Sequence, residues 1–447
     1  MRSRLLSVTL LSVLLAVSAF AQNRNRHVVV ISLDGFPAAR LHDPAVPLPV
    51  LRKLASEGAI ADGLVSINPT VTWPNHTSIV TGVGAERHGL LYNGLPVRPG
   101  EGKPLRIEPW VDKKELVQAP TVYDAARAAG LTTAEVDWVA IYPASSVNFA
   151  FPEVPKPDGA IEREMVAAGV MSEAELANWS KHAITLRDEF WTRAAVHIIE
   201  KHKPNLLLFH LLTTDSVQHS YGTNTLAGNT ALALADKQVQ RVLEALDRAG
   251  IRNSTTVLVV SDHGFRSYNK LIHPNALLRS QGLLRDKDGA IDCDAWAIPE
   301  GGTANVYITR ESGRAESLKK MEAAFHKVPG VSKVILPAEY AQYGYPNLAK
   351  QPRMADMVLA AEPGYAFDAA ATGETVTDVP AGSVRGAHGY LNSDPDMAAI
   401  LVAAGAGIKP GTRLGKVPNV NVAATIAQLL GLSLPGIDGV PIREMLK

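Results

Sequence analysis

The sequence predicts an α/β protein in which helices sandwich a mostly parallel β-sheet. Residues 27–33, 206–212 and 255–260 form short runs made mostly of Val, Leu and Ile. Such runs are typical of strands that are buried on both faces. Longer stretches with helical patterning separate these runs. Strands that alternate with helices favour a parallel sheet, because each helix carries the chain back to the edge where the previous strand began.

The elements before residue 265 continue this alternation. Pro74 suits the first turn of a helix, and Gly82 can end that helix. Residues 151–185 are rich in Pro and Glu, and we expect an irregular cap or lid there. The expected helices are residues 49–58, 74–81, 122–129, 186–201 and 232–250, and the further strands are residues 60–67 and 133–136.

Residues 265–385 break the alternation, and we interpret them as an inserted α+β subdomain. Their expected elements are strands at 304–308, 331–335 and 357–361 and a helix at 315–326. The α/β pattern then returns with a strand at 398–402 and a helix at 421–430. We therefore predict a catalytic core made of residues 22–264 and 386–447, with residues 265–385 inserted into it.

The charge balance excludes a broad basic surface. The 447 residues contain 44 Lys plus Arg and 44 Asp plus Glu. A protein that grips a nucleic-acid polymer usually carries an excess of positive charge. We therefore expect no such binding, and any phosphate must be recognised through metal ions or a few placed donors. The expected partner is a small molecule.

The N-terminus predicts export. Arg2 and Arg4 precede an apolar run at 5–20, and small residues stand at positions 19 and 21. This arrangement indicates a signal peptide at 1–21 and a periplasmic or secreted protein. A membrane anchor is the alternative, but the run is shorter than the ~20 apolar residues of a span. Cys293 is the only cysteine, so the chain cannot form an internal disulfide.

Ionisable residues follow the predicted strands at their carboxyl ends, where open α/β sheets bind ligands. Asp34 follows the first strand, Asp215 follows the strand at 206–212, and Asp262 and His263 follow the strand at 255–260. A single Asp in such a place is often only a helix cap. Three of them together are better explained by a metal site.

Two further histidines complete the predicted metal site. His219 lies four residues after Asp215, which places both side chains on one helical face. His388 lies in a loop between glycines, where the backbone can approach a crowded site. Mixed carboxylate and imidazole ligands suit Zn²⁺ better than Ca²⁺ or Mg²⁺. Six protein ligands are too many for one catalytic zinc but suit two.

Thr72 is the candidate nucleophile. It lies just before Pro74, at a turn from strand to helix, where the helix dipole and free N–H groups favour an anion. A threonine hydroxyl is a weak nucleophile that metal coordination can activate. The alternative is that Thr72 only caps its helix.

The order and context of five motifs resemble the alkaline phosphatase superfamily, and within it the nucleotide pyrophosphatase/phosphodiesterase family. These motifs surround Asp34, Thr72, Asp215 with His219, Asp262 with His263, and His388, and they extend from about residue 27 to residue 445. The resemblance implies an alkaline phosphatase-like fold. It also implies hydrolysis of phosphate diesters or nucleotide pyrophosphates in two displacements, through a phosphothreonine intermediate.

The resemblance also implies a role for each motif. One Zn²⁺ would be held by Asp34, Asp262 and His263 and would activate Thr72. The other would be held by Asp215, His219 and His388 and would support the leaving group and then a water. Asn93 matches the family's asparagine that donates a hydrogen bond to a phosphate oxygen, although an Asn before Gly94 is also common in turns.

The substrate pocket is less clearly marked. Trp73 follows the nucleophile and could stack on a base, and Trp138 and Tyr142 could form another wall of the pocket. His210 occupies a position where the family often has a substrate-contacting tyrosine. The alternatives left open are a phosphomonoesterase or phosphonate hydrolase of the same superfamily and, more remotely, a non-catalytic exported metal-binding protein.

Overall fold

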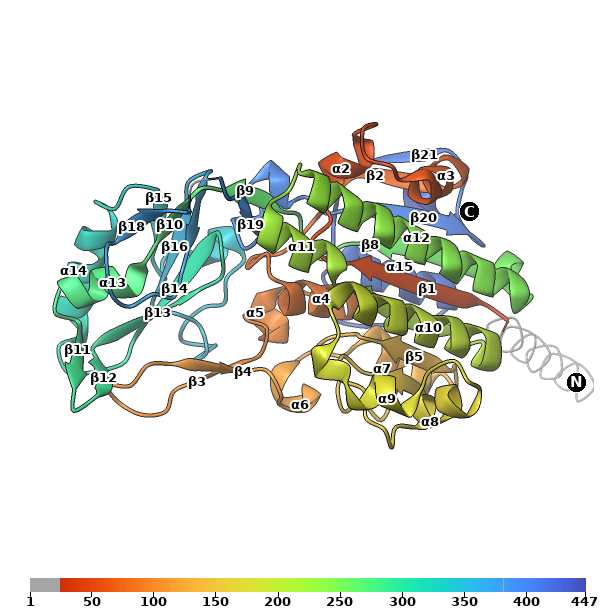
Figure 1. Cartoon of the computed structure of the whole chain (residues 1–447), viewed down its shortest axis with the longest axis horizontal. Coiled ribbons are helices and arrows are strands. Elements are labelled where there is room, and N and C mark those ends of the chain that lie inside the picture. Colours follow the sequence, from red (N-terminus) through yellow and green to blue (C-terminus); the bar gives the residue numbers. More distant parts are fainter. Residues whose placement is uncertain (1–24, 381) are drawn as a thin grey trace, which may run out of the picture.

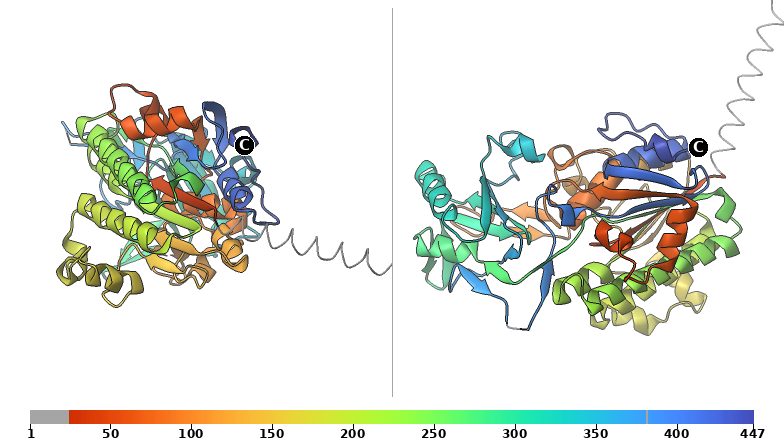
Figure 2. Two further views of the ribbon diagram at one scale, coloured as in Figure 1. Left: turned by 90° about the vertical axis from the view of Figure 1, so that its right-hand side faces the viewer. Right: turned by 90° about the horizontal axis from the view of Figure 1, so that it is seen from above.

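The computed structural model describes residues 25–380 and 382–447. The proposed signal peptide at 1–21 lies outside the described residues. Within the described ranges, no helix is both long enough and apolar enough to cross a membrane. Figure 1 shows two parts, a helix-covered sheet that holds β1 and a smaller part that holds β11–β16, and Figure 2 shows the same two parts from above.

The centre of the larger part is an eight-stranded sheet in the order β21-β2-β20-β8-β1-β7-β5-β6. β20 runs antiparallel to its neighbours β2 and β8, and the other pairs are parallel. This arrangement confirms the mostly parallel sheet. The strands are β1 (His27–Leu33), β2 (Ala59–Val65), β5 (Thr133–Val136), β6 (Phe149–Phe151), β7 (Leu206–Leu211), β8 (Thr255–Val260), β20 (Leu401–Gly405) and β21 (Thr412–Pro418).

Alternate side chains of β1 enter two different cores. Val29, Ile31 and Leu33 pack into one core, which is covered by helices including α3, α10 and α12. Val28 and Val30 pack into the other, which is covered by α4, α7 and α15. Figure 1 shows α10 and α12 lying along one face of the sheet. The helices are α3 (Pro49–Glu57), α4 (Thr72–Thr81), α7 (Val122–Ala128), α10 (Ile184–His202), α12 (Leu226–Arg248) and α15 (Asn421–Leu430).

Residues 151–185 are more regular than the sequence indicates. They form α8 (Ala160–Ala167) and α9 (Glu173–Ala177), so the expectation of an irregular segment is wrong. α9 begins with a capping box between Ser172 and Glu175, which satisfies two backbone N–H groups. Ile161, Met165 and Leu176 from these helices enter the sheet core. Short helices of this kind gain most of their stability from tertiary packing, which local composition does not reveal.

The smaller part has a sheet of its own, in the order β13-β14-β16-β15. Its strands are β13 (Ala295–Pro299), β14 (Thr303–Ile308), β15 (Val331–Ile335) and β16 (Met357–Ala361), and α14 (Arg314–Phe325) packs against it. A separate hydrophobic core includes Met321 and Phe325 of α14. The segments of the predicted subdomain therefore pack together, and its boundaries at 265 and 385 stay a prediction.

Glu135 is an ionisable residue inside the central sheet. Its side chain on β5 is buried, and Oε2 accepts a hydrogen bond from the Trp138 N–H at 3.1 Å. Burial raises the pKa of Glu135 to about 8. Between pH 4.5 and about 8 the Glu135 carboxyl therefore keeps its proton in the folded protein, whereas the same carboxyl loses its proton in the unfolded chain, where its pKa is 4.5. Folding stability should then fall as the pH rises from about 4.5 towards 8.

We predict that Glu135→Gln removes this pH dependence. The amide keeps the acceptor for Trp138 but cannot ionise. Between pH 6 and 8 the free energy of unfolding should therefore fall more steeply for the wild type than for the variant, and the two slopes should differ by about 1 kcal/mol per pH unit. Denaturant unfolding in matched buffers measures the free energy of unfolding of the wild type and of the variant at each pH. Glu316→Gln, which changes an exposed carboxylate of α14, serves as control. Parallel pH profiles of wild type and Glu135→Gln would contradict the prediction.

Candidate active site

Three neighbouring strands bring the predicted carboxylates together. β8, β1 and β7 lie side by side in the sheet. Asp34 directly follows β1, Asp262 lies two residues after the end of β8, and Asp215 lies in the first turn of α11 (Thr213–Tyr221) after β7. Because all three strands are parallel, their carboxyl ends meet at one edge. The fold thus places three acidic side chains at the edge where ligands bind in such sheets.

The His388 loop reaches this edge from a small β-ribbon. It follows β19 (Arg385–Ala387), which pairs with β9 (Arg266–Tyr268). Gly389 has φ +80°, and a Cβ there would lie 1.6 Å from the Glu300 carbonyl oxygen. Only glycine fits both the left-handed backbone and this close approach. Gly389 therefore lets the loop pack against the insertion while the imidazole of His388 faces the aspartates.

The structure brings all six predicted metal ligands into one cluster. Ligand atoms of Asp215, His219 and His388 lie within 4.8 Å of one another, as do those of Asp34, Asp215 and His263. Asp262 adjoins the second group, since its Oδ2 lies 3.2 Å from the His263 Nε2. The rings of His263 and His388 stack at 3.9 Å. One of the two expected triads appears directly, whereas the second group contains Asp215 in the place where Asp262 was expected.

The three histidines present the same nitrogen to the cluster. The Nδ1 atom of His219 lies 3.1 Å from the Gly386 carbonyl, that of His263 lies 3.0 Å from the Gly264 carbonyl, and that of His388 lies 3.0 Å from the Thr70 carbonyl. Because a carbonyl only accepts, each Nδ1 donates, which leaves Nε2 as the ring atom that can coordinate a metal. Histidines that bind metals are commonly oriented in this way.

The carboxylates carry buried oxygens that the protein leaves unsatisfied. Within the described part of the chain, Asp34 Oδ1, Asp215 Oδ1 and Asp262 Oδ2 accept no hydrogen bond. Burial, followed by the neighbouring Asp262 and Asp215, raises the pKa of Asp34 well above its ordinary value. Burial also opposes ionisation of Asp215, but His219 and His388 outweigh it and lower the pKa of that carboxyl. Three clustered acids with free oxygens are a site for cations.

The imidazoles are suited to the same cations. Burial lowers the pKa of His263 to about 4 and, together with His263 itself, lowers the pKa of His388 to about 3. Both rings are therefore neutral near pH 7, which is the form that binds metals. Orphaned carboxylate oxygens and neutral imidazoles together fit a pair of zinc ions better than Ca²⁺ or Mg²⁺.

Thr72 lies at the first turn of α4, beside the cluster. The helix begins at Thr72 itself, two residues earlier than the sequence indicates. The Thr72 Oγ1 lies 3.4 Å from the His263 Nε2, and the side chain is largely buried. The N-terminal end of a helix favours negative charge through its free N–H groups and its dipole. The hydroxyl is thus placed at an electropositive helix end, next to the metal ligands.

Asn93 is held beside Thr72 in a fixed orientation. Its Oδ1 accepts a hydrogen bond of 2.9 Å from the Trp73 N–H. Both residues line the same cavity as Thr72, which has a volume of about 280 Å³. With Oδ1 engaged, the amide Nδ2 is the group left to donate to a ligand.

His210 lies behind the cluster rather than in the cavity. Its Nε2 is 3.1 Å from Asp34 Oδ2, and its Nδ1 is 3.0 Å from the Asp137 carbonyl. The side chain is fully buried and does not line either of the cavities at the site. The sequence suggested substrate contact because it gave the position of the residue but not the direction of its ring. In this position His210 orients Asp34.

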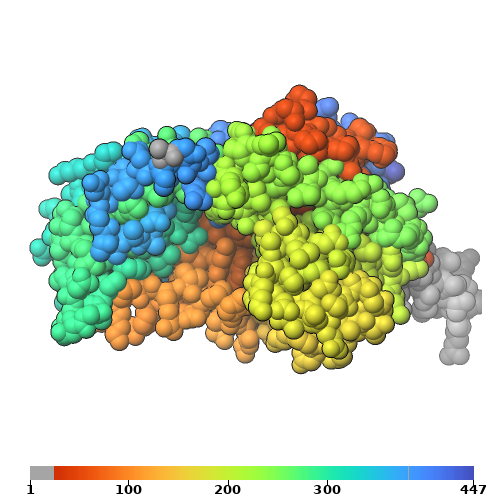
Figure 3. Space-filling view, in the orientation of Figure 1, coloured from red at the N-terminus to blue at the C-terminus, as the bar shows by residue number. Residues whose placement is uncertain are grey.

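An apolar cleft adjoins the metal cluster. Its volume is about 570 Å³, and Trp73, Trp110 and Val139 line both this cleft and the smaller cavity. Trp138 and Tyr142 line the cleft but not the smaller cavity. The sequence analysis missed Trp110, because an exposed Trp in a loop carries no periodic signal; its side chain is 70% exposed. In Figure 3 the surface is hollowed between the orange segment near residue 100 and the yellow segment beyond residue 160.

Comparisons with known proteins identify a family for the chain. The family model for type I phosphodiesterase/nucleotide pyrophosphatase matches residues 28–391. Mouse ectonucleotide pyrophosphatase/phosphodiesterase family member 7 is 23% identical over 99% of this chain and 92% of its own length. Human family member 1 is 26% identical over 91% of this chain, which spans only 40% of that longer relative.

Solved structures show the same fold. Murine ectonucleotide pyrophosphatase/phosphodiesterase 5 superposes with a TM-score of 0.71 at 18% identity, covering 94% of this chain and all of that one. An inactive threonine-to-alanine variant of the murine protein, in complex with AMP, superposes with a TM-score of 0.70 at 18% identity and the same coverage. Together with the family model, the match shows that the chain belongs to the type I phosphodiesterase/nucleotide pyrophosphatase family, whose members are enzymes that hydrolyse phosphoric esters.

Proposed function

We propose that this chain is a two-zinc phosphodiesterase in which Thr72 attacks the phosphorus atom of its substrate. The observation that carries the proposal is the cluster of buried, unsatisfied carboxylate oxygens and imidazole Nε2 atoms beside the Thr72 hydroxyl. Asp34, Asp262 and His263 would hold one cation, and Asp215, His219 and His388 would hold the other. Bound there, two cations would supply the positive charge that favours an ionised hydroxyl and neutralises phosphate oxygens.

The protein's own groups perform the remaining work. The Thr72 Oγ forms a bond to phosphorus while the bond from phosphorus to the leaving oxygen breaks. Asn93 Nδ2 donates to a non-bridging oxygen, and its contact with the Trp73 N–H keeps it aimed there. Water then attacks the phosphothreonine from the opposite side and releases Thr72. Positioned donors of this kind contribute most where charge develops in the transition state.

The composition of the cavity supports a diester substrate. The residues that line the 280 Å³ cavity in the described chain include no Lys or Arg. A diester carries one negative charge on its phosphate, whereas a monoester carries up to two, which require more neutralisation. The compact pair of Thr72 and Asn93 therefore suits the less charged substrate. A phosphomonoesterase or phosphonate hydrolase is the second candidate.

The apolar cleft supports a substrate with a flat or apolar group on the ester. Trp73 and Trp110 stand where such a group would leave the phosphate cavity. Aromatic side chains stack on bases and also bury hydrocarbon. The murine structural relative is seen in complex with AMP, so we propose a nucleotide diester or nucleotide pyrophosphate as the leading substrate class.

We also propose that the enzyme acts outside the cytoplasm. The relatives named above are ectonucleotide enzymes, and the signal peptide at 1–21 predicts export of this chain. The free thiol of Cys293 is buried, which is compatible with an oxidising compartment because it cannot readily reach a second thiol.

Replacing Thr72 tests the nucleophile. We predict that Thr72→Ala lowers kcat/KM for bis-p-nitrophenyl phosphate at least ~10³-fold, because no covalent intermediate can form, while Thr72→Ser stays within ~10²-fold of wild type. Zinc content, measured by atomic emission, should not change. Thr77→Ala serves as the matched control, since Thr77 lies on the same helix and its buried hydroxyl has no hydrogen-bond partner in the described chain.

Two outcomes would count against this role for Thr72. Comparable activity of Thr72→Ala and wild type would show that another group attacks phosphorus. No turnover by zinc-loaded wild type on any activated ester would favour the non-catalytic metal-binding protein.

Rates on three substrates test the substrate class. We predict that zinc-loaded enzyme hydrolyses p-nitrophenyl thymidine monophosphate faster than bis-p-nitrophenyl phosphate, by tenfold or more in kcat/KM, since tenfold corresponds to about 1.4 kcal/mol of added contact in the cleft. p-Nitrophenyl phosphate should be slowest. Trp110→Ala, at an exposed position, should slow only the nucleotide diester.

Each other ranking has a defined meaning. If the simple diester matches the nucleotide diester and Trp110→Ala has no effect, the cleft does not read a nucleoside, and lipid or other diesters become the better proposal. If the monoester is hydrolysed fastest, the protein is a phosphatase and the argument from Asn93 and the uncharged cavity is wrong.

A further inference from the structure

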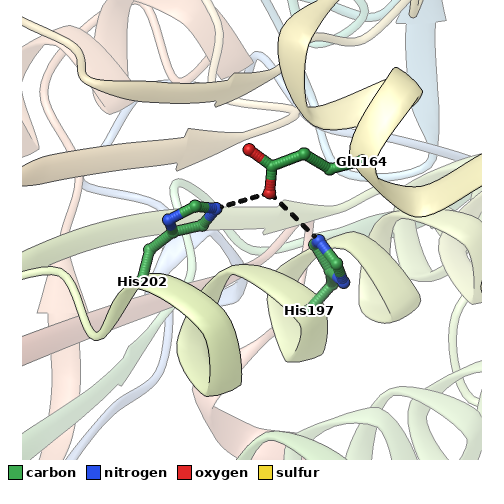
Figure 4. Close-up of side chains that lie close together, drawn as sticks. All are labelled: Glu164, His197 and His202. Atoms are coloured by element: carbon green, nitrogen blue, oxygen red, sulfur yellow. Dashed lines mark hydrogen bonds and ion pairs between the residues drawn. The ribbon is translucent and has the colours of Figure 1, made fainter. Parts of the chain in front are cut away.

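A second cluster of metal-binding side chains lies away from the catalytic edge, on the helices that cover the sheet. Ligand atoms of Glu164, His197 and His202 all lie within 4.8 Å of one another. Glu164 is on α8, and both histidines are on α10. Figure 4 shows the two imidazoles pointing at the same carboxylate from below. We propose that these three residues bind a zinc ion that fastens α8 to α10.

One of the two distances to the Glu164 carboxylate fits a zinc site better than a hydrogen bond. Glu164 Oε2 lies 3.4 Å from the His197 Nε2 and 2.8 Å from the His202 Nε2. The first distance is long for an N–H···O bond, which normally measures about 2.7–3.2 Å. Around a tetrahedral zinc with bonds of about 2.0–2.1 Å, neighbouring ligand atoms lie about 3.3–3.5 Å apart. An outward shift of His202 by about 0.5 Å would bring its distance from Glu164 Oε2 into the same range.

The ligand set favours zinc over other common cations. Two imidazoles and one carboxylate suit Zn²⁺, whereas Ca²⁺ and Mg²⁺ prefer oxygen ligands only. In the described chain, both ion pairs of Glu164 are with these histidines, so no Lys or Arg competes for the carboxylate. The Glu164 side chain is 37% exposed, so an ion and one water can reach the open side.

The surroundings hold the ligands in place. The ring of His202 stacks on Phe149 of β6 at 4.0 Å and 18°, which limits its rotation. His197 lies within α10, where the helix backbone fixes its Cα, and its side chain is only 10% exposed. A site whose ligands are already oriented loses little conformational entropy when an ion binds.

The consequence of binding would reach the substrate cleft. α8 belongs to the segment that follows β6, and this segment includes Pro152, Glu153 and Lys156, which line the cleft. The two sides of the proposed site come from α8 and from α10, which packs on the sheet core. Zinc would thus join the cleft-bearing segment to the body of the protein and reduce its local opening. This inference does not depend on the chemistry proposed for Thr72.

Metal content tests the site directly. Mature wild type, the double variant His197→Gln/His202→Gln and the control His326→Gln, an exposed histidine of the insertion, are dialysed against micromolar zinc chloride and analysed by atomic emission. We expect wild type and control to bind one zinc per chain more than the double variant. Unchanged kcat for bis-p-nitrophenyl phosphate shows that the variant is folded with its catalytic cluster intact. Equal zinc content in all three proteins would overturn the proposal.

Hydrogen–deuterium exchange covers the case in which the double variant fails to fold. Zinc added to chelator-treated wild type should slow exchange in residues 160–167 severalfold. Glu164→Gln, an isosteric change at a partly exposed position, should abolish that protection while protection around Asp34 and Asp215 persists. If zinc leaves exchange in residues 160–167 unchanged in the wild type, the site does not exist.

Discussion

The crowding of three carboxylates governs the proposed catalytic edge of this protein. Asp34, Asp215 and Asp262 meet where three parallel strands end, and each keeps one oxygen without a hydrogen bond in the described chain. Burying charged oxygens without partners costs several kcal/mol unless cations or protons compensate. The raised pKa of Asp34, caused by burial and then by its acidic neighbours, reflects that cost. Two cations would relieve it for all three side chains.

The surrounding structure keeps the ligands in a geometry that cations can use. Backbone carbonyls bind the Nδ1 atoms of the three histidines, and His210 lies against Asp34 from behind. The same edge of the sheet carries the N-terminal end of α4, so the proposed nucleophile and the proposed metal ligands share one rigid frame. Sites built on regular elements hold such groups more tightly than sites built on loops alone. Asp34, Asp262 and His263 follow the ends of central strands, whereas His388 lies in a loop that Gly389 positions against the insertion.

Much of the fold, and the gathering of six Asp and His side chains at one edge of the sheet, could be predicted from the sequence. The composition of residues 27–33, 206–212 and 255–260 indicates buried strands. A parallel sheet then brings the residues that follow its strands to one edge. What the sequence could not show was the direction of side chains. His210 follows from the same pattern as its neighbours, yet its ring lies behind Asp34 and not in the cavity.

Features that depend on tertiary contact were also hidden. The helices α8 and α9 are short and lie in a Pro- and Glu-rich segment, so their stability comes from packing on the sheet core. Trp110 acquires its place beside the cavity only through the path of its loop. Glu164 and the pair His197 and His202 are more than thirty residues apart, and only the packing of α8 on α10 brings them together.

The most direct test of this account is anomalous diffraction at the zinc absorption edge, from crystals of the mature protein grown with zinc. The account predicts two peaks at the catalytic edge, about 3.5–4 Å apart, one among Asp34, Asp262 and His263 and one among Asp215, His219 and His388. Both peaks should persist in Thr72→Ala. A single peak, or none, at this edge in zinc-saturated crystals would contradict the claim that these six side chains form a two-zinc site.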